Sequence, residues 1–178
     1  MYGGNLGKPQ DIPFVVKCLK EAKDDSGCFF IICGSGSDYY VLEEYAKSEQ
    51  PTNFLLINGL PKEEYDSMLR CCDVGLLFLD HRFTIPNFPS RMLSYMECSI
   101  PILACTDFNT DVGQIIEAEK FGWWCTSNNA QEFVKVCRRF VSNQANNKLM
   151  GENGRKYLEL NYTSKRVYDI ICEHVKWN

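Results

Sequence analysis

The sequence predicts an α/β fold in which helices cover both faces of a doubly wound parallel sheet. Four continuous apolar runs have the length of strands, and segments with helical spacing separate them. Two more helical segments end the chain with no strand between them. Alternation of strand and helix is typical of βαβ units, whose strands run parallel. The four runs are CFFIIC (28–33), NFLLIN (53–58), VGLLFL (74–79) and IPILAC (100–105).

The composition of these runs indicates strands that are buried on both faces. None of them alternates apolar with polar residues, as a strand with one face in water would. GWWCT (122–126) is shorter and is predicted to be a strand at the edge of the sheet. The start of the chain, MYGGN, has the character of a strand end that runs into a glycine turn. We therefore expect a first strand cut short, in a piece of a longer protein to which Met1 was added.

Each predicted helix carries apolar residues three and four positions apart, which places them on one face. Asp11 precedes the first helix and is a candidate N-cap, because its side chain can accept a hydrogen bond from a free backbone amide. The last two helices are predicted at about 147–160 and 164–177. The apolar faces comprise Ile12, Val15, Val16 and Leu19, then Tyr65, Met68, Leu69 and Cys72, then Ala130, Phe133, Val134, Cys137, Phe140 and Val141.

Length and charge narrow the classes of function. The 178 residues suit one compact domain, or one half of a two-domain enzyme. The formal charge of −4 gives no electrostatic basis for binding duplex nucleic acid. No apolar run approaches 18 residues, and the N-terminus has no features of a signal peptide. We expect a cytoplasmic protein.

The ten cysteines are predicted to be reduced and buried, and to behave as small apolar residues. Most lie within apolar runs, and none forms the CxxC pair that zinc sites favour. Cys71 and Cys72 are adjacent, which suits neither a zinc ribbon nor an ordinary disulfide. Reduced thiols agree with a cytoplasmic location.

Ligands bind doubly wound sheets at the carboxyl ends of the strands, so the segments that follow the strands are the candidate site. Glycine turns let backbone amides approach an anion, and Lys8 and Arg91 add positive charge. Each feature alone has a plainer explanation: a tight turn, Asp38 as an ordinary N-cap, or His81 and Arg82 facing solvent. Their convergence at one end of the sheet favours an anion site. The segments are GGNLGK (3–8), GSGSD (34–38), NGLPKEE (58–64), DHRFTIPNFPSR (80–91) and TDFNTDVG (106–113).

An arginine stands at the start of a predicted helix in NFPSRMLSYM (87–96). The N-terminus of a helix is already electropositive, so Arg91 opposes the helix unless an anion meets it. A bound diphosphate would be such an anion. The alternative is that Arg91 pairs with a carboxylate such as Asp107 or Asp111.

Five segments in the same order resemble the C-terminal, nucleotide-sugar-binding domain of GT-B-fold, family 4 glycosyltransferases (glycosyl transferases group 1). That resemblance implies a Rossmann-like half of a GT-B fold over residues 1–178, followed by C-terminal helices. In the family the acceptor binds to an N-terminal domain, which we expect to lie outside this chain. The segments are YGGNLGK (2–8), FFIICGSGSD (29–38), NFLLINGLPKEEYDSMLRCCDVGLLFL (53–79), NFPSRMLSYMECSIPILA (87–104) and GENGRKYLE (151–159).

The resemblance also implies roles for individual residues. A loop after the first strand would approach the donor diphosphate, the second turn would line the nucleotide crevice, and Leu60 would meet the base through its backbone. Arg91 and Lys8 would stabilise the leaving diphosphate. The implied residues are Gly3, Gly4, Asn5 and Lys8 for the diphosphate, Gly34, Ser35 and Gly36 for the nucleotide, and Pro89, Ser90, Arg91 and Met92 at the helix start.

This sequence departs from the family at two positions. Many members carry a pair of glutamates that hold the transferred sugar and the ribose, and here Pro86 and Ser94 stand in their place. Ser94 can still make one hydrogen bond to ribose. The sugar would then be held by other polar residues of the loops, or donor binding is altered. The candidates are Arg82, Asn87, Asp107, Asn109 and Asp111, and the last three can instead be caps of the following helix.

The activity that the resemblance implies is transfer of a glycosyl unit from a UDP- or GDP-linked sugar to an acceptor hydroxyl. We expect no cofactor and no metal, since no Asp-x-Asp sequence is present. The resemblance implies a role in cell-surface polysaccharide synthesis. The protein would then lie in the cytoplasm at the inner face of the membrane, which it would contact through its N-terminal half. The fragment alone should be inactive. The alternatives are a GT-B sugar-nucleotide epimerase, for which His81 is the one candidate, and a non-catalytic Rossmann-like binding module.

Overall fold

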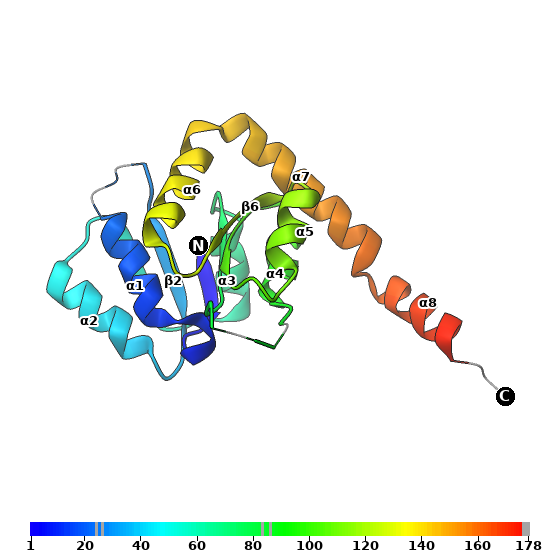
Figure 1. Ribbon diagram of the computed structural model, residues 1–178, viewed down its shortest axis with the longest axis horizontal. Helices are drawn as coiled ribbons and strands as arrows, with labels where there is room; N and C mark the ends of the chain where they lie inside the picture. The colour runs from blue at the N-terminus through cyan, green and yellow to red at the C-terminus, as the bar shows by residue number, and fades with distance from the viewer. Residues whose placement is uncertain (24, 26, 83, 86, 176–178) are drawn as a thin grey trace.

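The computed structural model describes residues 1–23, 25, 27–82, 84–85 and 87–175. Its strands alternate with helices as far as the sixth strand, and three consecutive helices follow (Figure 1). The strands are β1 (Tyr2–Asn5), β2 (Phe30–Ser35), β3 (Phe54–Ile57), β4 (Gly75–Phe78), β5 (Ile102–Thr106) and β6 (Gly122–Thr126).

Helices connect the strands, and none of those described is long and apolar enough to cross a membrane. A short 3-10 helix, η1 (Lys8–Gln10), precedes the first of them. The α-helices are α1 (Ile12–Glu21), α2 (Tyr39–Glu49), α3 (Lys62–Leu69), α4 (Arg91–Glu97), α5 (Val112–Ala118), α6 (Ala130–Ser142), α7 (Gln144–Asn161) and α8 (Ser164–His174).

All strand pairs are parallel, in two sheets with the orders β1-β2-β3 and β4-β5-β6. The sheets join where β1 lies beside β4. There the amino group of Met1 donates to the Val74 carbonyl at 2.6 Å, and the Leu76 amide donates to the Met1 carbonyl at 2.8 Å. The spatial order is therefore β3-β2-β1-β4-β5-β6, which is that of a doubly wound sheet with its switch point between β1 and β4. The predicted fold class is confirmed.

Side chains from successive positions of the central strands enter two separate cores. Leu76 and Phe78 face the core covered by α1, α2 and α6, whereas Leu77 between them faces the core covered by α3, α4 and α5. Tyr95 of α4 is fully buried in the second core, and its hydroxyl donates to the Leu76 carbonyl at 2.9 Å. The expected burial on both faces therefore holds for β4 and β5.

Burial on both faces was the wrong expectation for one strand. β3 lies at the edge of its sheet, and the Leu55 side chain is 42% exposed. An edge strand has a neighbour on one side alone, so less of its surface is covered. The edge position predicted for β6 is confirmed. The strand predicted to be cut short, β1, has four residues paired to β2.

The two C-terminal helices differ in their packing. α7 lies against α4 and β6, where the rings of Tyr157 and Phe121 are 5.4 Å apart. α8 has no buried residue and projects away from the body (Figure 1). Its predicted extension to Trp177 falls outside the described residues.

All ten cysteines are free thiols, as predicted. Five are buried in the cores, and the Sγ atoms of Cys105 and Cys125, on adjacent strands, are 3.5 Å apart. Cys71 is exposed, so it does not fit the expectation of burial. Its neighbour Cys72 is half-buried, and burial raises the pKa of the Cys72 thiol.

The close approach of β1 and β2 predicts a large effect of one methyl group. A Cβ atom on Gly34 would lie 1.8 Å from the Gly4 carbonyl oxygen, which is backbone and cannot turn aside. We expect Gly34→Ala to lower the free energy of unfolding by about 2 kcal/mol or more, as overpacking does. Urea denaturation measures this change.

Gly27→Ala is the matched control for that substitution. Its Cβ would meet the Val141 side chain at 3.2 Å, and a side chain can move. We expect this control to change the free energy of unfolding by no more than about 0.5 kcal/mol. Equal stability of Gly34→Ala and the control would contradict the tight strand contact.

Candidate functional site at the carboxyl ends of the strands

The end of β1 is in direct contact with two side chains from other elements. A Cβ atom on Gly3 would lie 2.3 Å from the hydroxyl oxygen of Tyr65 in α3. Gly4 has φ +147°, and a Cβ atom there would lie 2.2 Å from Nη2 of Arg91 in α4. The missing side chains therefore leave the room that Tyr65 and Arg91 occupy.

The second predicted glycine turn lies beside the first. The Leu6 amide donates to the Ser35 carbonyl and the Asp38 amide donates to the Leu6 carbonyl, both at 2.9 Å. A Cβ atom on Gly36 would lie 2.2 Å from the Leu6 carbonyl oxygen. The structure thus brings together the loops after β1 and β2. Asp38 occupies the N-cap position of α2, but its side chain caps no amide and accepts instead from Ser37 at 2.7 Å.

Arg91 is half-buried at the first position of α4, a helix with no acidic residue in its first turn. Its Nη1 donates to the Tyr65 hydroxyl at 3.4 Å, and its Cζ lies 5.9 Å from the centre of that ring. Within the described part of the chain, no carboxylate lies within 4.0 Å of the guanidinium. The alternative pairing with Asp107 or Asp111 therefore does not occur.

The first turn of α4 offers fewer backbone donors than expected. The Met92 amide donates to the Pro89 carbonyl at 3.0 Å, and the Leu93 amide donates to the Ser90 carbonyl at 3.1 Å. The Met92 side chain is fully buried in the core. Both observations favour a packing role for Met92. The guanidinium of Arg91 is the charged group that this helix start presents.

Gln10, which the sequence analysis missed, closes the loop after β1. Its Oε1 accepts from the Asn5 side-chain amide and from the Gly7 amide, each at 3.3 Å. Lys8, at the start of η1, is exposed and forms no ion pair with a described residue. The polar residue after Pro9 in GGNLGKPQ was the available signal for Gln10.

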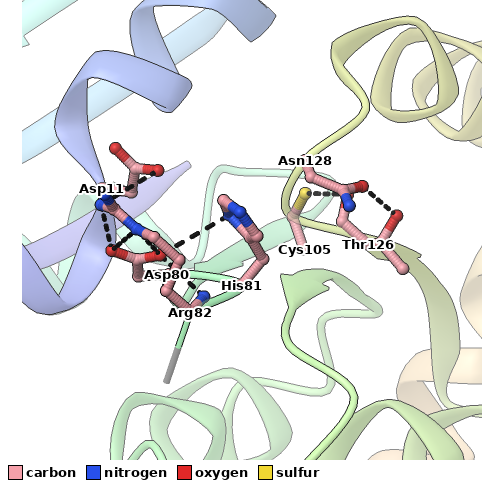
Figure 2. Close-up of polar contacts among 7 residues, drawn as sticks. All are labelled: Asp11, Asp80, His81, Arg82, Cys105, Thr126 and Asn128. Atoms are coloured by element: carbon pink, nitrogen blue, oxygen red, sulfur yellow. Dashed lines mark hydrogen bonds and ion pairs between the residues drawn. The ribbon is translucent and has the colours of Figure 1, made fainter. Parts of the chain in front are cut away.

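Arg82, unlike Arg91, forms an ion pair with a carboxylate. Asp80 follows β4, is buried, and accepts from Arg82 through Nε at 2.8 Å and Nη2 at 2.5 Å (Figure 2). The Arg82 backbone amide adds a further hydrogen bond to Asp80 at 2.9 Å, and Asp11 lies 3.9 Å from the guanidinium. These contacts hold the pKa of Asp80 below its usual range. Because its guanidinium is already paired, Arg82 is a weaker candidate than Arg91 for binding the donor. Its proposed role in holding the sugar stays a prediction.

Asp11, Asp80 and His81 form a group whose ligand atoms lie within 4.8 Å of one another. Nδ1 of His81 is 3.6 Å from Oδ1 of Asp80, the same oxygen that accepts a hydrogen bond from Nε of Arg82 (Figure 2). The guanidinium of Arg82 already meets both carboxylates, so a metal ion would face a fixed positive charge at the same oxygens. The donor set therefore does not suit a divalent cation. Asp11, the predicted N-cap of α1, makes no capping hydrogen bond.

The loop after β5 is closed by Asp107. This carboxylate is 1% exposed, and Oδ1 accepts from the amides of Asn109 and Thr110 at 2.7 and 2.8 Å. Such bonds are those of a turn-forming residue. The geometry supports the turn-forming role that the sequence left open for Asp107. Asp111 occupies the N-cap position of α5 without capping it.

The remaining predicted residues lie on neighbouring segments. Leu60 is half-buried against the second core, Ser94 is half-buried on α4, and Asn87 is exposed. Phe88, next to Asn87, packs on Tyr162 with ring centres 5.2 Å apart. Pro86 lies outside the described residues, so the departure from the usual glutamate is not tested there.

A cavity of about 370 Å³ occurs at the opposite, amino edge of the sheet. Phe30, Val74 and Cys137 are among its lining residues. No predicted residue of the site lines it. In doubly wound folds ligands bind at the carboxyl edge, so this cavity is not the candidate site.

Comparison with known proteins identifies the fold and the family. A model of the family described as glycosyl transferases group 1 matches residues 1–157. Chitobiosyldiphosphodolichol beta-mannosyltransferase of Dictyostelium discoideum is 27% identical over 112 residues, which are 59% of this chain and 22% of that protein.

Solved structures resemble this chain in fold at low sequence identity. TarM of S. aureus, in complex with fondaparinux, alpha-GlcNAc-glycerol and UDP, has a TM-score of 0.74 at 14% identity, covering 97% of this chain and 34% of TarM. HepE of Anabaena in complex with UDP has a TM-score of 0.71 at 14% identity, covering 97% of this chain and 47% of HepE. The C-terminal domain of LpcC of Francisella tularensis has a TM-score of 0.72 at 16% identity, covering 92% of this chain and 86% of that domain.

The chain thus spans 22% of the mannosyltransferase and 34% of TarM. Its doubly wound sheet is the Rossmann-like half of a GT-B fold. The family model extends over residues 1–157 of 178, which includes every strand and every loop of the candidate site. The chain therefore belongs to the glycosyl transferases group 1 family.

Proposed function

We propose that this chain binds the nucleoside-diphosphate sugar donor of a glycosyltransferase, with the diphosphate at the end of β1. The observation that carries the proposal is the placement of Arg91. A half-buried guanidinium without a carboxylate partner among the described residues lies against the backbone of Gly4. Such a group is stabilised by a bound anion.

In this proposal the side chain of Arg91 contributes more binding free energy than the helix dipole does. The dipole contributes about 0.3–1 kcal/mol at an exposed helix end. A hydrogen bond from a charged donor contributes about 1.5–3 kcal/mol, and a guanidinium can form two in parallel to a phosphate. With two amides of the first turn of α4 already bonded, Arg91 is the main attraction for the diphosphate.

In the proposed reaction, the bond between the anomeric carbon and the diphosphate oxygen breaks, and its electron pair stays on the diphosphate. The oxygen of the acceptor hydroxyl forms the new bond to that carbon, and its proton is released to the solvent. Arg91, and Lys8 from the loop after β1, stabilise the growing negative charge on the leaving group. Fixed positive charge aimed at a developing anion is a large contribution in many enzymes.

The solved structures support this choice of ligand. TarM and HepE were determined with UDP, and HepE also with UDP-glucose. For this chain we propose a UDP- or GDP-linked sugar as the donor. The chain spans a third of TarM, so we place the acceptor on a separate N-terminal domain. Cell-surface polysaccharide assembly, in the cytoplasm at the inner face of the membrane, is the proposed setting.

Removal of the Arg91 guanidinium is the first test. We expect Arg91→Ala to weaken binding of UDP or GDP by roughly ten- to a hundredfold, because at least one charge-assisted hydrogen bond is lost. Isothermal titration calorimetry of this chain with each nucleotide measures the effect and names the base.

Arg166→Ala is the matched control, because it removes an equal charge from the projecting helix α8. Affinity for the nucleotide should stay unchanged in this variant. If neither UDP nor GDP binds the unaltered chain, the proposed donor site is wrong and a non-catalytic binding module becomes the better description.

Binding is expected to need no divalent cation. Arg91 and Lys8 supply the positive charge, and the carboxylates of Asp11 and Asp80 are already paired with Arg82. The dissociation constant of the nucleotide should be the same in excess EDTA and in excess Mg²⁺, measured by calorimetry. Binding that appears only with Mg²⁺ would show that a metal bridges the diphosphate.

A further inference from the structure

Three tyrosines lie near Arg91, and their hydroxyl groups differ in their hydrogen bonds. The hydroxyl of Tyr2 donates to the Asn5 carbonyl at 2.7 Å. The hydroxyl of Tyr95 donates to the Leu76 carbonyl at 2.9 Å. Both of these protons are therefore already bound to backbone oxygens.

The hydroxyl of Tyr65 is in a different state. It accepts a hydrogen bond from Nη1 of Arg91 at 3.4 Å, and no described residue accepts its proton. A phenol can accept and donate at the same time, so its O–H remains available to a ligand. Burial is the main reason that the pKa of Tyr65 is raised, and the group therefore keeps its proton at neutral pH.

The position of Tyr65 is fixed by the end of β1. A side chain on Gly3 would overlap the ring, with a Cβ atom 2.3 Å from both Cε2 and Oη. The next residue, Gly4, faces the guanidinium of Arg91 in the same way. Two consecutive glycines thus bring one phenol and one guanidinium to the same turn, where their polar atoms meet.

We propose that the Tyr65 hydroxyl donates a hydrogen bond to the diphosphate of the donor, beside the bonds from Arg91. This inference rests on the proposed function, and it adds a ligand-binding residue from α3 to that site. By accepting from Nη1, Tyr65 also orients the guanidinium, so that its other nitrogens face the phosphate oxygens. An anion held by both groups receives hydrogen bonds from two elements, α3 and α4.

Tyr65→Phe tests the proposal because it removes the hydroxyl and keeps the ring. We expect the dissociation constant of UDP or GDP, whichever binds, to rise about tenfold by calorimetry, as for the loss of a hydrogen bond to a charged group. Tyr40→Phe, on an exposed tyrosine of α2, is the matched control and should leave the constant unchanged.

A second measurement separates phosphate binding from a general loss of shape. Binding of the matching nucleoside, uridine or guanosine, is followed by ligand-observed NMR for the unaltered chain and for Tyr65→Phe. The effect should be confined to the diphosphate, with the nucleoside equally bound by both proteins. Urea denaturation should give equal free energies of unfolding, since the hydroxyl makes one long hydrogen bond.

The outcomes are distinguishable. Nucleotide binding that is unaltered in Tyr65→Phe would overturn this inference and leave the role of Arg91 intact. An equal loss for nucleoside and diphosphate would also overturn it, because the hydroxyl would then act on the shape of the site. Absence of binding to the unaltered chain would overturn the proposed function, and the inference with it.

Discussion

The close contact of bare backbone at the end of β1 is the constraint on which the site depends. The Gly4 carbonyl lies where a Cβ atom of Gly34 would be, and Gly3 and Gly4 adjoin the side chains of Tyr65 and Arg91. Any larger residue at these positions would move a strand or displace a polar side chain. The same contact therefore joins β1 to β2 and sets the place of the polar groups that α3 and α4 contribute.

Two arginines at this edge of the sheet have opposite electrostatic environments. Arg82 is neutralised by Asp80, a buried carboxylate that would otherwise be costly to bury. Arg91 donates a hydrogen bond to Tyr65 and adjoins backbone that carries no charge. This edge of the sheet thus contains the ion pair of Arg82 and Asp80 after β4, and at the start of α4 the guanidinium of Arg91, which has no carboxylate partner among the described residues. This difference supports the proposal that an anionic ligand binds beside Arg91.

The strands and most helices followed from local pattern. Continuous apolar runs predicted β2 to β5 within a few residues, because burial requires apolar side chains wherever a strand is covered, and the shorter GWWCT segment predicted β6. The exposure of β3 and of α8 did not follow, since apolar residues such as Leu55 are compatible with an edge. The sequence pattern shows which residues can be buried, whereas the neighbouring elements of the fold decide how much of each side chain is covered.

The sequence alone determined the fold class, the glycine turns and the position of Arg91 at a helix start, because these depend on residue type and spacing along the chain. Tertiary structure decided which charges remain unpaired. Arg82 and Arg91 are alike in sequence, and only the arrangement of strands and helices puts one beside Asp80 and the other beside Tyr65. Tyr65 itself was predicted as part of an apolar helix face, and the structure places its hydroxyl against Gly3, more than sixty residues away along the chain. Interactions between distant segments are set by packing, which local spacing does not encode.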